Sequence, residues 1–490
     1  MSRAVGAIAC LAALGACSLE PHYERPAPAV PASWPAGDAY LRASEASLPS
    51  LSYRDIFRDT RLQAVIERAL ANNQDVRIAL ANVASARALY RVQRAELLPS
   101  IDATARTSTG NSSSGGNSNN GTGTGTGTIV QSSDDTRTTY NANVGFSAFE
   151  LDLFGRIRSL NAAALNEYLG SEAAVRSARL TLVAEVASAW LTLATDRSLL
   201  AIAEDTEANA TRSVDLTRAR LQGGIAPRSD LRQAETVLAQ ARADKADLTT
   251  VVAQDRNALE LLVGAPVAEA ELPPSIESVD QSLGEVPAGL DSSILLRRPD
   301  VVQAEYQLRA ANARIGAARA AFFPRISLTA VAGFASTALS ALFKDDSFTW
   351  SVSPTATLPI FDGGANSGNL AYAKAQRELA LAQYQQAIQT AFREVSDALA
   401  RRGTIDRQFA AQSDLEASAA DNYMLANARY REGIEPFLTS LDAQRTLYTA
   451  RRSLASTRLV RADNLVTLYR ALGGDMLVDT LPPPGETTNP

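Results

Sequence analysis

The chain has 490 residues, of which 46% are apolar and 20% charged, and its formal net charge is −6. These ordinary values argue against a disordered chain and against a bundle of transmembrane helices. Basic residues are dispersed among acidic ones, whereas a nucleic-acid-binding protein needs clustered Lys and Arg to contact phosphates. The length allows two or three domains, or one extended architecture built from a repeat.

Residues 1–16 have the pattern of a signal peptide. Arg3 supplies positive charge, and the apolar stretch that follows it, about 13 residues, is shorter than the ~20 that span a bilayer. It ends in Leu14-Gly15-Ala16-Cys17, which is typical of a bacterial lipoprotein, so we expect Cys17 to be acylated and to become the mature N-terminus. Ser18, rather than Asp, follows it and favours the outer membrane. Removal of Cys10 with the peptide would leave no internal disulfide.

One order of elements occurs twice: helix, two strands, long helix, turn, helix. A helix ends before Pro99 in the first half and before Pro324 in the second, an offset of 225 (324 − 99). Phe154 and Phe361 give a smaller offset, 207 (361 − 154). We therefore predict a duplication, with an N-terminal segment at 17–60, repeat 1 at 61–264, a linker at 265–298, repeat 2 at 299–473 and a tail at 474–490.

The unequal offsets predict an insertion between the strands of the first repeat. Residues 110–128 are rich in Gly, Ser and Thr, a composition typical of a flexible loop. They lack the Gly-Lys-Ser/Thr ending that a nucleotide-binding loop requires.

Alternating apolar and polar residues predict four strands, each with one apolar face: Ile101–Ala105, Tyr140–Phe149, Ile326–Ala330 and Phe348–Leu358. A soluble sandwich would fit this pattern. Four strands of up to ~10 residues, with aromatic residues near their ends, favour membrane strands instead. The smallest transmembrane barrels have ~8 strands and lipid tolerates no open edge, so the chain must oligomerise, and either two or three copies would suffice.

Two Ala-rich segments, from Ile157 to about Leu221 and from Asn369 to about Arg431, are predicted to be long helices. At ~1.5 Å per residue each would extend roughly 90 Å, and frequent Ala allows close lateral packing. Both end in a Gly-Ile-X-Pro turn, in which Gly stops one helix and Pro starts the next. We therefore predict two helical hairpins whose tips lie far from the strands.

Three segments carry a resemblance to a known family: Glu150–Arg156, Leu296–Val301, and Ala311–Gly316 running on to Phe323–Leu328. Over nearly the whole mature chain, the sequence resembles the TolC/OprM-like outer-membrane factor family, in its NodT-type lipoprotein branch. The resemblance implies an α+β membrane protein with two repeats per chain. Three chains with four strands each would close a 12-stranded transmembrane β-barrel, continuous with a long α-helical periplasmic tunnel.

The same resemblance implies a function. Members of this family are outer-membrane exit channels of tripartite efflux systems. We therefore expect a homotrimer in the bacterial outer membrane that conducts small molecules passively, extends into the periplasm and contacts outer-membrane lipid. Its partners would be a periplasmic adaptor (membrane fusion protein) and an inner-membrane RND transporter, and its only attached group would be the lipid on Cys17.

The family closes its tunnel just past the second hairpin tip, which here matches Phe437–Arg445. Leu438, Asp442 and Arg445 fall on one helical face there. Around a threefold axis, Leu438 would form an apolar constriction, and Asp442 and Arg445 would bond to neighbouring helices. Spacing alone also fits a solvated face with an ordinary ion pair. The hairpin tips are expected adaptor contacts, although turn chemistry alone explains their residues: Gly224, Ile225, Pro227, Gly433, Ile434 and Pro436.

Two other classes of protein compete with this interpretation. An enzyme is disfavoured because the only histidine, His22, lies in a Pro-rich segment, which leaves no His-based triad or His-rich metal site. The carboxylates of Glu150 and Asp152 fit capping or solvation better than catalysis, so we predict no catalytic and no metal site. A lipid-anchored periplasmic scaffold would explain Cys17 and the long helices, but not the alternating strands.

Overall fold

The structure is a computed structural model that describes residues 18–31, 33–35, 37, 40, 53–111, 136–280, 284 and 292–474. Cys17, the predicted signal peptide, most of the 110–128 insertion and nearly all of the tail lie outside the described residues. The chain forms two compact units. Unit 1 comprises Met1–Glu24, Arg87–Asn166 and Arg309–Leu379, and unit 2 comprises Arg25–Ala86, Glu167–Leu308 and Ala380–Pro490. Within the described ranges, none of the helices combines the length and apolarity that crossing a membrane requires.

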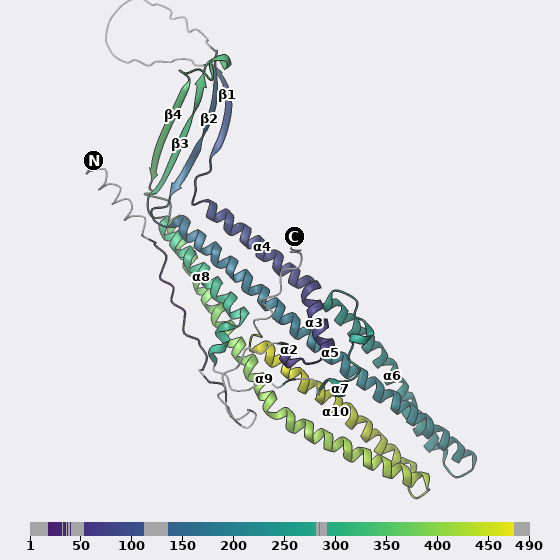
Figure 1. Ribbon diagram of the computed structural model, residues 1–490. Helices are drawn as coiled ribbons and strands as arrows, with labels where there is room; N and C mark the ends of the chain where they lie inside the picture. Colours follow the sequence, from purple (N-terminus) through teal and green to yellow (C-terminus); the bar gives the residue numbers. More distant parts are fainter. Residues whose placement is uncertain are drawn as a thin grey trace, which may run out of the picture. The chain divides into compact units, whose positions relative to one another are not determined.

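Unit 1 contains one antiparallel sheet (Figure 1). The strand order follows the chain: β1 (Asp102–Asn111), β2 (Thr136–Leu151), β3 (Arg325–Ser336) and β4 (Phe348–Thr357). Among the described strands, β1 and β4 each pair on one side only. Because every neighbour is antiparallel, these two edge strands run in opposite directions.

The sheet register gathers apolar side chains on one face. Val144 of β2 lies opposite Ala332 of β3, which lies opposite Trp350 of β4. Alternate residues share a face, so this face extends along all three strands. It also carries Tyr140, Ala142, Phe146, Leu328, Ala330, Phe334, Phe348 and Val352. The other face carries small and polar residues, with Val331 as an exception.

A β-bulge interrupts the strict alternation that the sequence predicts for β2, so that prediction was wrong at this point. Phe146 pairs with Ala330 and Phe149 with Leu328, which leaves Ser147 and Ala148 opposite one residue of β3. Ala148 has φ +54°. The extra residue returns Phe149 to the apolar face, where its ring meets that of Phe146 edge to face at 6.1 Å.

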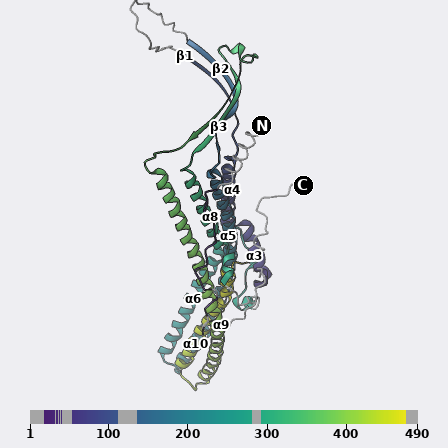
Figure 2. The same cartoon turned by 90° about the vertical axis from the view of Figure 1, so that its left-hand side faces the viewer.

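A long or medium helix adjoins each strand. Helix α4 (Gln74–Ala95) precedes β1, and α8 (Pro299–Ala320) precedes β3. Helix α5 (Arg156–Gln222) follows β2, and α9 (Ala365–Arg431) follows β4. Figure 2 shows the sheet and these helices after a quarter turn. A short 3-10 helix, η3 (Leu339–Ala341), lies between β3 and β4.

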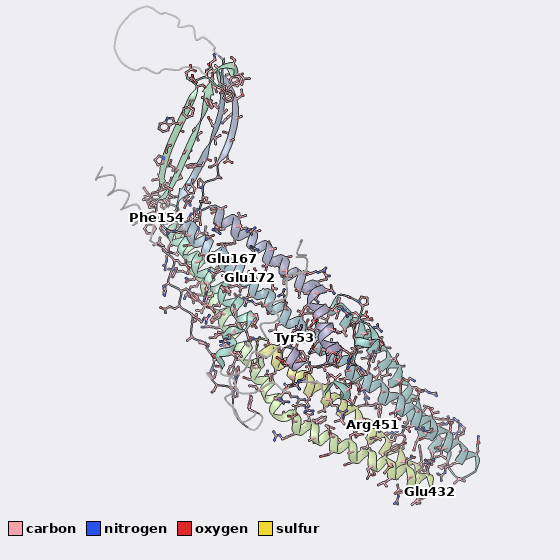
Figure 3. The ribbon with its side chains drawn as sticks, viewed as in Figure 1. Tyr53, Phe154, Glu167, Glu172, Glu432 and Arg451 are labelled. Atoms are coloured by element: carbon pink, nitrogen blue, oxygen red, sulfur yellow. The ribbon has the colours of Figure 1, made fainter. Side chains whose placement is uncertain are left out.

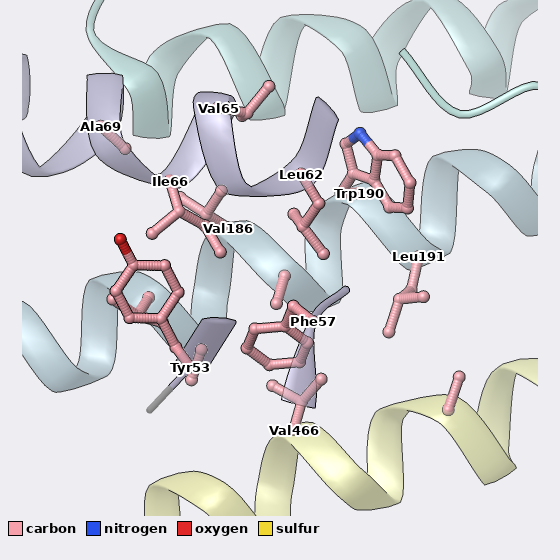
Figure 4. Packing of buried hydrophobic residues seen from close by; sticks show 14 of the residues in the cluster. Tyr53, Phe57, Leu62, Val65, Ile66, Ala69, Val186, Trp190, Leu191 and Val466 are labelled. Atoms are coloured by element: carbon pink, nitrogen blue, oxygen red, sulfur yellow. The ribbon is translucent and has the colours of Figure 1, made fainter. Parts of the chain in front are cut away.

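Unit 2 is helical and holds the main apolar core. Helices α2 (Tyr53–Ile56) and α3 (Thr60–Asn72) pack against α5 and against α10 (Phe437–Ala471). Figure 4 shows Leu62 beside Trp190, Ile66 beside Val186 and Phe57 next to Val466, all of them buried. Each such side chain contributes ~1.5–3 kcal/mol when it leaves water. The remaining elements are α6 (Arg228–Val263), η1 (Glu269–Glu271), α7 (Ile276–Asp280) and η2 (Ser292–Arg297).

Ion pairs also connect the helices of unit 2. Arg451 of α10, labelled in Figure 3, contacts Asp205 of α5 at 2.9 Å and Glu416 of α9 at 3.3 Å. Because these groups are partly exposed, each pair contributes little to stability by itself. They connect α10 to both long helices.

Candidate functional site: hairpin tips and gate

Two helical hairpins end in turns of the same geometry. Helices α5 and α6 are joined at Gly224 (φ +75°), and helices α9 and α10 at Gly433 (φ +76°). The left-handed conformation favours Gly at both positions. In each turn the amide that follows this glycine donates a hydrogen bond to the carbonyl five residues earlier. In the first turn, Ile225 N donates to the Arg220 carbonyl at 2.9 Å. This is the Schellman pattern that ends helices.

The second turn repeats these contacts. Ile434 N donates to the Arg429 carbonyl at 2.9 Å, as Ile225 does in the first turn. Pro227 and Pro436 then cap the N-termini of α6 and α10 in extended conformation. The side chains of Ile225 and Ile434 are exposed. Each hairpin tip, the predicted adaptor contact, therefore presents a small apolar surface.

The hairpins pack on each other just behind their tips. The guanidinium carbon of Arg220 in α5 lies 4.7 Å from the centre of the Tyr430 ring. The same guanidinium donates a hydrogen bond to the backbone carbonyl of Tyr430 at 2.9 Å. The Tyr430 ring lies 5.3 Å from that of Phe437. Val214, Leu231 and Leu441 belong to the same apolar cluster. These contacts hold the two tips side by side within one chain.

The predicted gate residues lie together on an exposed face of α10. Leu438 is 52% exposed, whereas neighbouring Leu441 is buried in the tip cluster. Asp442 and Arg445 are also exposed, and their closest charged atoms, Oδ1 and Nη1, are 3.7 Å apart. An exposed pair at this distance adds little stability, so both side chains are available for contacts with another chain.

A groove beside the gate contains residues that the sequence analysis missed. It has a volume of about 200 Å³ and is lined from α5, α6 and α10, with Arg445 at its border. Inside it, the Tyr448 hydroxyl donates to Oδ2 of Asp244 at 2.6 Å. Burial and this hydrogen bond raise the pKa of Tyr448 to about 12, so it is a donor at neutral pH. The partners are 204 residues apart, and no local pattern connects them.

The carboxylates of Glu150, near the end of β2, and Asp152, just after it, are held by arginines. Both Glu150 oxygens accept from Arg156 at 2.8 Å, and Arg325 approaches Glu150 at 3.5 Å. Asp152 accepts from the Arg158 amide at 2.8 Å. Structural pairing accounts for both carboxylates.

A family model for outer membrane efflux proteins matches residues 65–265 and 290–474. The chain belongs to the outer membrane efflux protein family. The family resemblance inferred from the sequence is thereby confirmed. A relative in Pseudomonas putida, the solvent efflux pump outer membrane protein SrpC, is 44% identical over 467 residues, which cover 94% of this chain and 96% of the relative.

Two solved structures are similar to this chain in fold as well as in sequence. A membrane protein from Pseudomonas aeruginosa superposes on this chain with a TM-score of 0.83 and is 38% identical in sequence. The match covers 94% of this chain and 98% of the chain of that protein. The open state of the MtrE outer membrane channel of Neisseria gonorrhoeae has a TM-score of 0.78 at 36% identity, with the same coverage.

Proposed function

We propose that this protein is the outer-membrane exit channel of a tripartite, RND-type efflux system and that it conducts small molecules passively from periplasm to exterior. One observation carries the proposal. In a chain of the outer membrane efflux protein family, a four-stranded sheet has an apolar face and pairs on one side only at β1 and β4. An apolar face suits lipid, and lipid requires that both edges be paired.

Three copies would close the barrel. Because β1 and β4 run in opposite directions, adding β1 of the next chain to β4 keeps every strand pair antiparallel. Three chains give twelve strands, and helices α5 and α9 would then line a periplasmic tunnel. The solved MtrE outer membrane channel, similar over 94% of this chain, supports this assembly.

The remaining assignments follow from the same role. Cys17 would carry a lipid that anchors the chain in the outer membrane, and the protein would have no catalytic or metal site and no nucleic-acid partner. A periplasmic adaptor and an inner-membrane RND transporter would complete the pump. The similarity to SrpC, named as a component of a solvent efflux pump, supports such partners.

Leu438, Asp442 and Arg445 would hold the periplasmic end shut. Around a threefold axis, three Leu438 side chains would form an apolar constriction that disfavours water. Asp442 and Arg445, exposed in one chain, would form charge-assisted hydrogen bonds to the next chain. Partner binding at the tips would open the gate by separating these helices.

Planar-bilayer conductance tests the channel and the gate together. Wild type would be compared with Leu438→Ser and Asp442→Ala, and with Leu425→Ser, which removes an equally exposed leucine of α9. We expect stable wild-type openings that increase only in the two gate variants. Equal conductance in all four proteins would move the gate elsewhere. No conductance from any inserted protein would favour the lipid-anchored scaffold.

Adaptor contact at the tips is tested by photo-cross-linking from Ala226 and Glu435 in cells that express the pump. We expect both positions to capture the adaptor because each lies in an exposed turn. A probe at exposed Leu261, near the other end of α6, serves as the control. Failure at both tips would contradict the assignment.

A further inference from the structure

Two short linkers of unit 1 expose unusually apolar surfaces. Between β4 and α9, Ile360 is 94% and Phe361 92% exposed. Between α4 and β1, Leu98 is 72% and Ile101 70% exposed. Apolar patches of this kind on a folded chain mark interaction sites. Both linkers adjoin an edge strand. The residues that pack on them can therefore be inferred from how neighbouring strands pair.

The chain itself contains one contact between the linkers of two paired strands. Phe154 follows β2 and Phe323 precedes β3, and their rings stack at 4.8 Å with an interplanar angle of 22°. Figure 3 labels Phe154 at this junction. The reason is the antiparallel pairing: Leu151 at the end of β2 lies opposite Ile326 at the start of β3. The linkers that continue these strands must therefore lie side by side.

The duplication predicts where the second contact of this kind forms. Phe361 corresponds to Phe154, and Leu98, which directly precedes Pro99, corresponds to Phe323, which directly precedes Pro324. In one chain, the described β4 and β1 do not pair with each other. They are equally long, ten residues each, and run in opposite directions. Pairing between chains would place the end of β4 beside the start of β1.

We propose that Ile360 and Phe361 of one chain pack on Leu98 and Ile101 of a second copy, and that three such contacts form an apolar ring where the barrel joins the tunnel. This inference rests on the proposed trimeric channel and identifies the residues that close it. At the junction within the chain, Glu150 pairs with Arg156. Their counterparts by the 207-residue offset are Thr357 and Gly363. The contact between chains therefore depends on burial of apolar surface, without an ion pair at these positions.

Disulfide trapping in outer-membrane preparations tests the contact. Leu98→Cys is combined with Phe361→Cys, the membranes are oxidised, and non-reducing gels are compared with reduced ones. We expect covalent dimers and trimers. The matched control, Phe154→Cys with Phe323→Cys, should form its disulfide within one chain and keep the monomer mass. The Leu98→Cys and Phe361→Cys single variants are further controls. They show whether the new cysteine forms a disulfide with Cys17 or with the same cysteine of another copy.

The outcomes separate this contact from the proposed function. If the control pair oxidises and the Leu98/Phe361 pair yields only monomer, while native mass spectrometry and conductance report an intact trimeric channel, the contact is wrong and the channel stands. That result would favour lipid as the occupant of both linkers. A wild type with neither oligomer nor conductance would overturn both proposals.

A second variant measures the energetic role of the ring. Phe361→Ser should accelerate dissociation of the detergent-solubilised oligomer about tenfold, because truncation of an aromatic hot spot at an interface costs at least that factor. Phe154→Ser, which removes the corresponding ring within one chain, should change dissociation less. Equal effects would contradict a contact between chains at Phe361.

Discussion

The hydroxyl of Tyr448 in α10 donates a 2.6 Å hydrogen bond to Oδ2 of Asp244 in α6, and so joins the two helical hairpins of one chain. Tyr448 lies three residues beyond Arg445, which borders the same groove. Hydrogen bonds to charged acceptors contribute ~1.5–3 kcal/mol when partly buried. This bond therefore favours the conformation in which the hairpins stay together.

We predict that Tyr448→Phe raises the open probability of the channel in planar bilayers. The substitution keeps the ring and removes only the donor, so a loss of ~1.4 kcal/mol from the closed state corresponds to roughly tenfold more opening. Tyr372→Phe, at an exposed tyrosine of α9, is the control. Unchanged opening in Tyr448→Phe would show that the hairpins do not separate when the gate opens.

A second prediction concerns Arg298, in the Leu296–Val301 segment. Its buried guanidinium donates to the Ala471 carbonyl at 2.8 Å, to Asp300 at 2.8 Å and to Glu394 at 2.9 Å. Arg298→Met should destabilise the protein by ~3 kcal/mol, because it leaves carboxylates and a carbonyl without their donor. Thermal unfolding checks this. Arg297→Met, at the exposed neighbour, should have little effect, and equal stability of both variants would refute the argument.

A third prediction concerns Gly316, in the Ala311–Gly316 segment. A Cβ there would lie 2.6 Å from Ser159 Oγ and 2.8 Å from Glu20 Cα. The backbone at Glu20 is held on α8 because Asn312 donates to the Pro21 carbonyl at 2.8 Å. Gly316→Ala should displace this segment and raise hydrogen exchange at residues 19–24.

Gly368→Ala is the control for that experiment. Its added Cβ would meet no atom within 4 Å, and Ala in a helix should stabilise the protein by up to ~1 kcal/mol relative to Gly. Unchanged exchange at residues 19–24 in Gly316→Ala would mean that the close approach to Glu20 does not position the segment.

The fourth prediction is a pH dependence at Asp196 of α5. Burial and a hydrogen bond with Asp255 raise the pKa of Asp196 from 3.8 to about 7. As pH rises from about 4 to about 7, the unfolded chain has lost this proton while the folded chain retains it, so stability falls across that window. Asp196→Asn should remove this decline, giving a higher melting temperature than wild type at pH 8 and a smaller difference at pH 5.

Asp247→Asn, at an exposed position of α6, controls for the change in net charge. It should follow the wild-type pH profile. If Asp196→Asn also follows that profile between pH 5 and pH 8, the two carboxyl groups do not share a proton in the folded protein.

Much of the candidate site could be predicted from the sequence because its signals are local. The 3.6-residue period places Leu438, Asp442 and Arg445 on one face, and in the structure all three are exposed on α10. Gly and Pro mark the hairpin turns through their own backbone preferences. The groove around Tyr448 could not be found in this way, because its partner Asp244 is brought near only by packing of α6 against α10.

Local patterns were enough to predict the four strands, the long helices, the hairpin turns and the family, because periodicity, helix stops and motifs act over a few residues. Three-dimensional packing set the strand order β1-β2-β3-β4 and the bulge that returns Phe149 to the apolar face. It also decided that Phe154 stacks on Phe323 while Phe361 stays exposed. These features depend on pairing between segments far apart in the chain, and strand register and burial set that pairing, which no local pattern records.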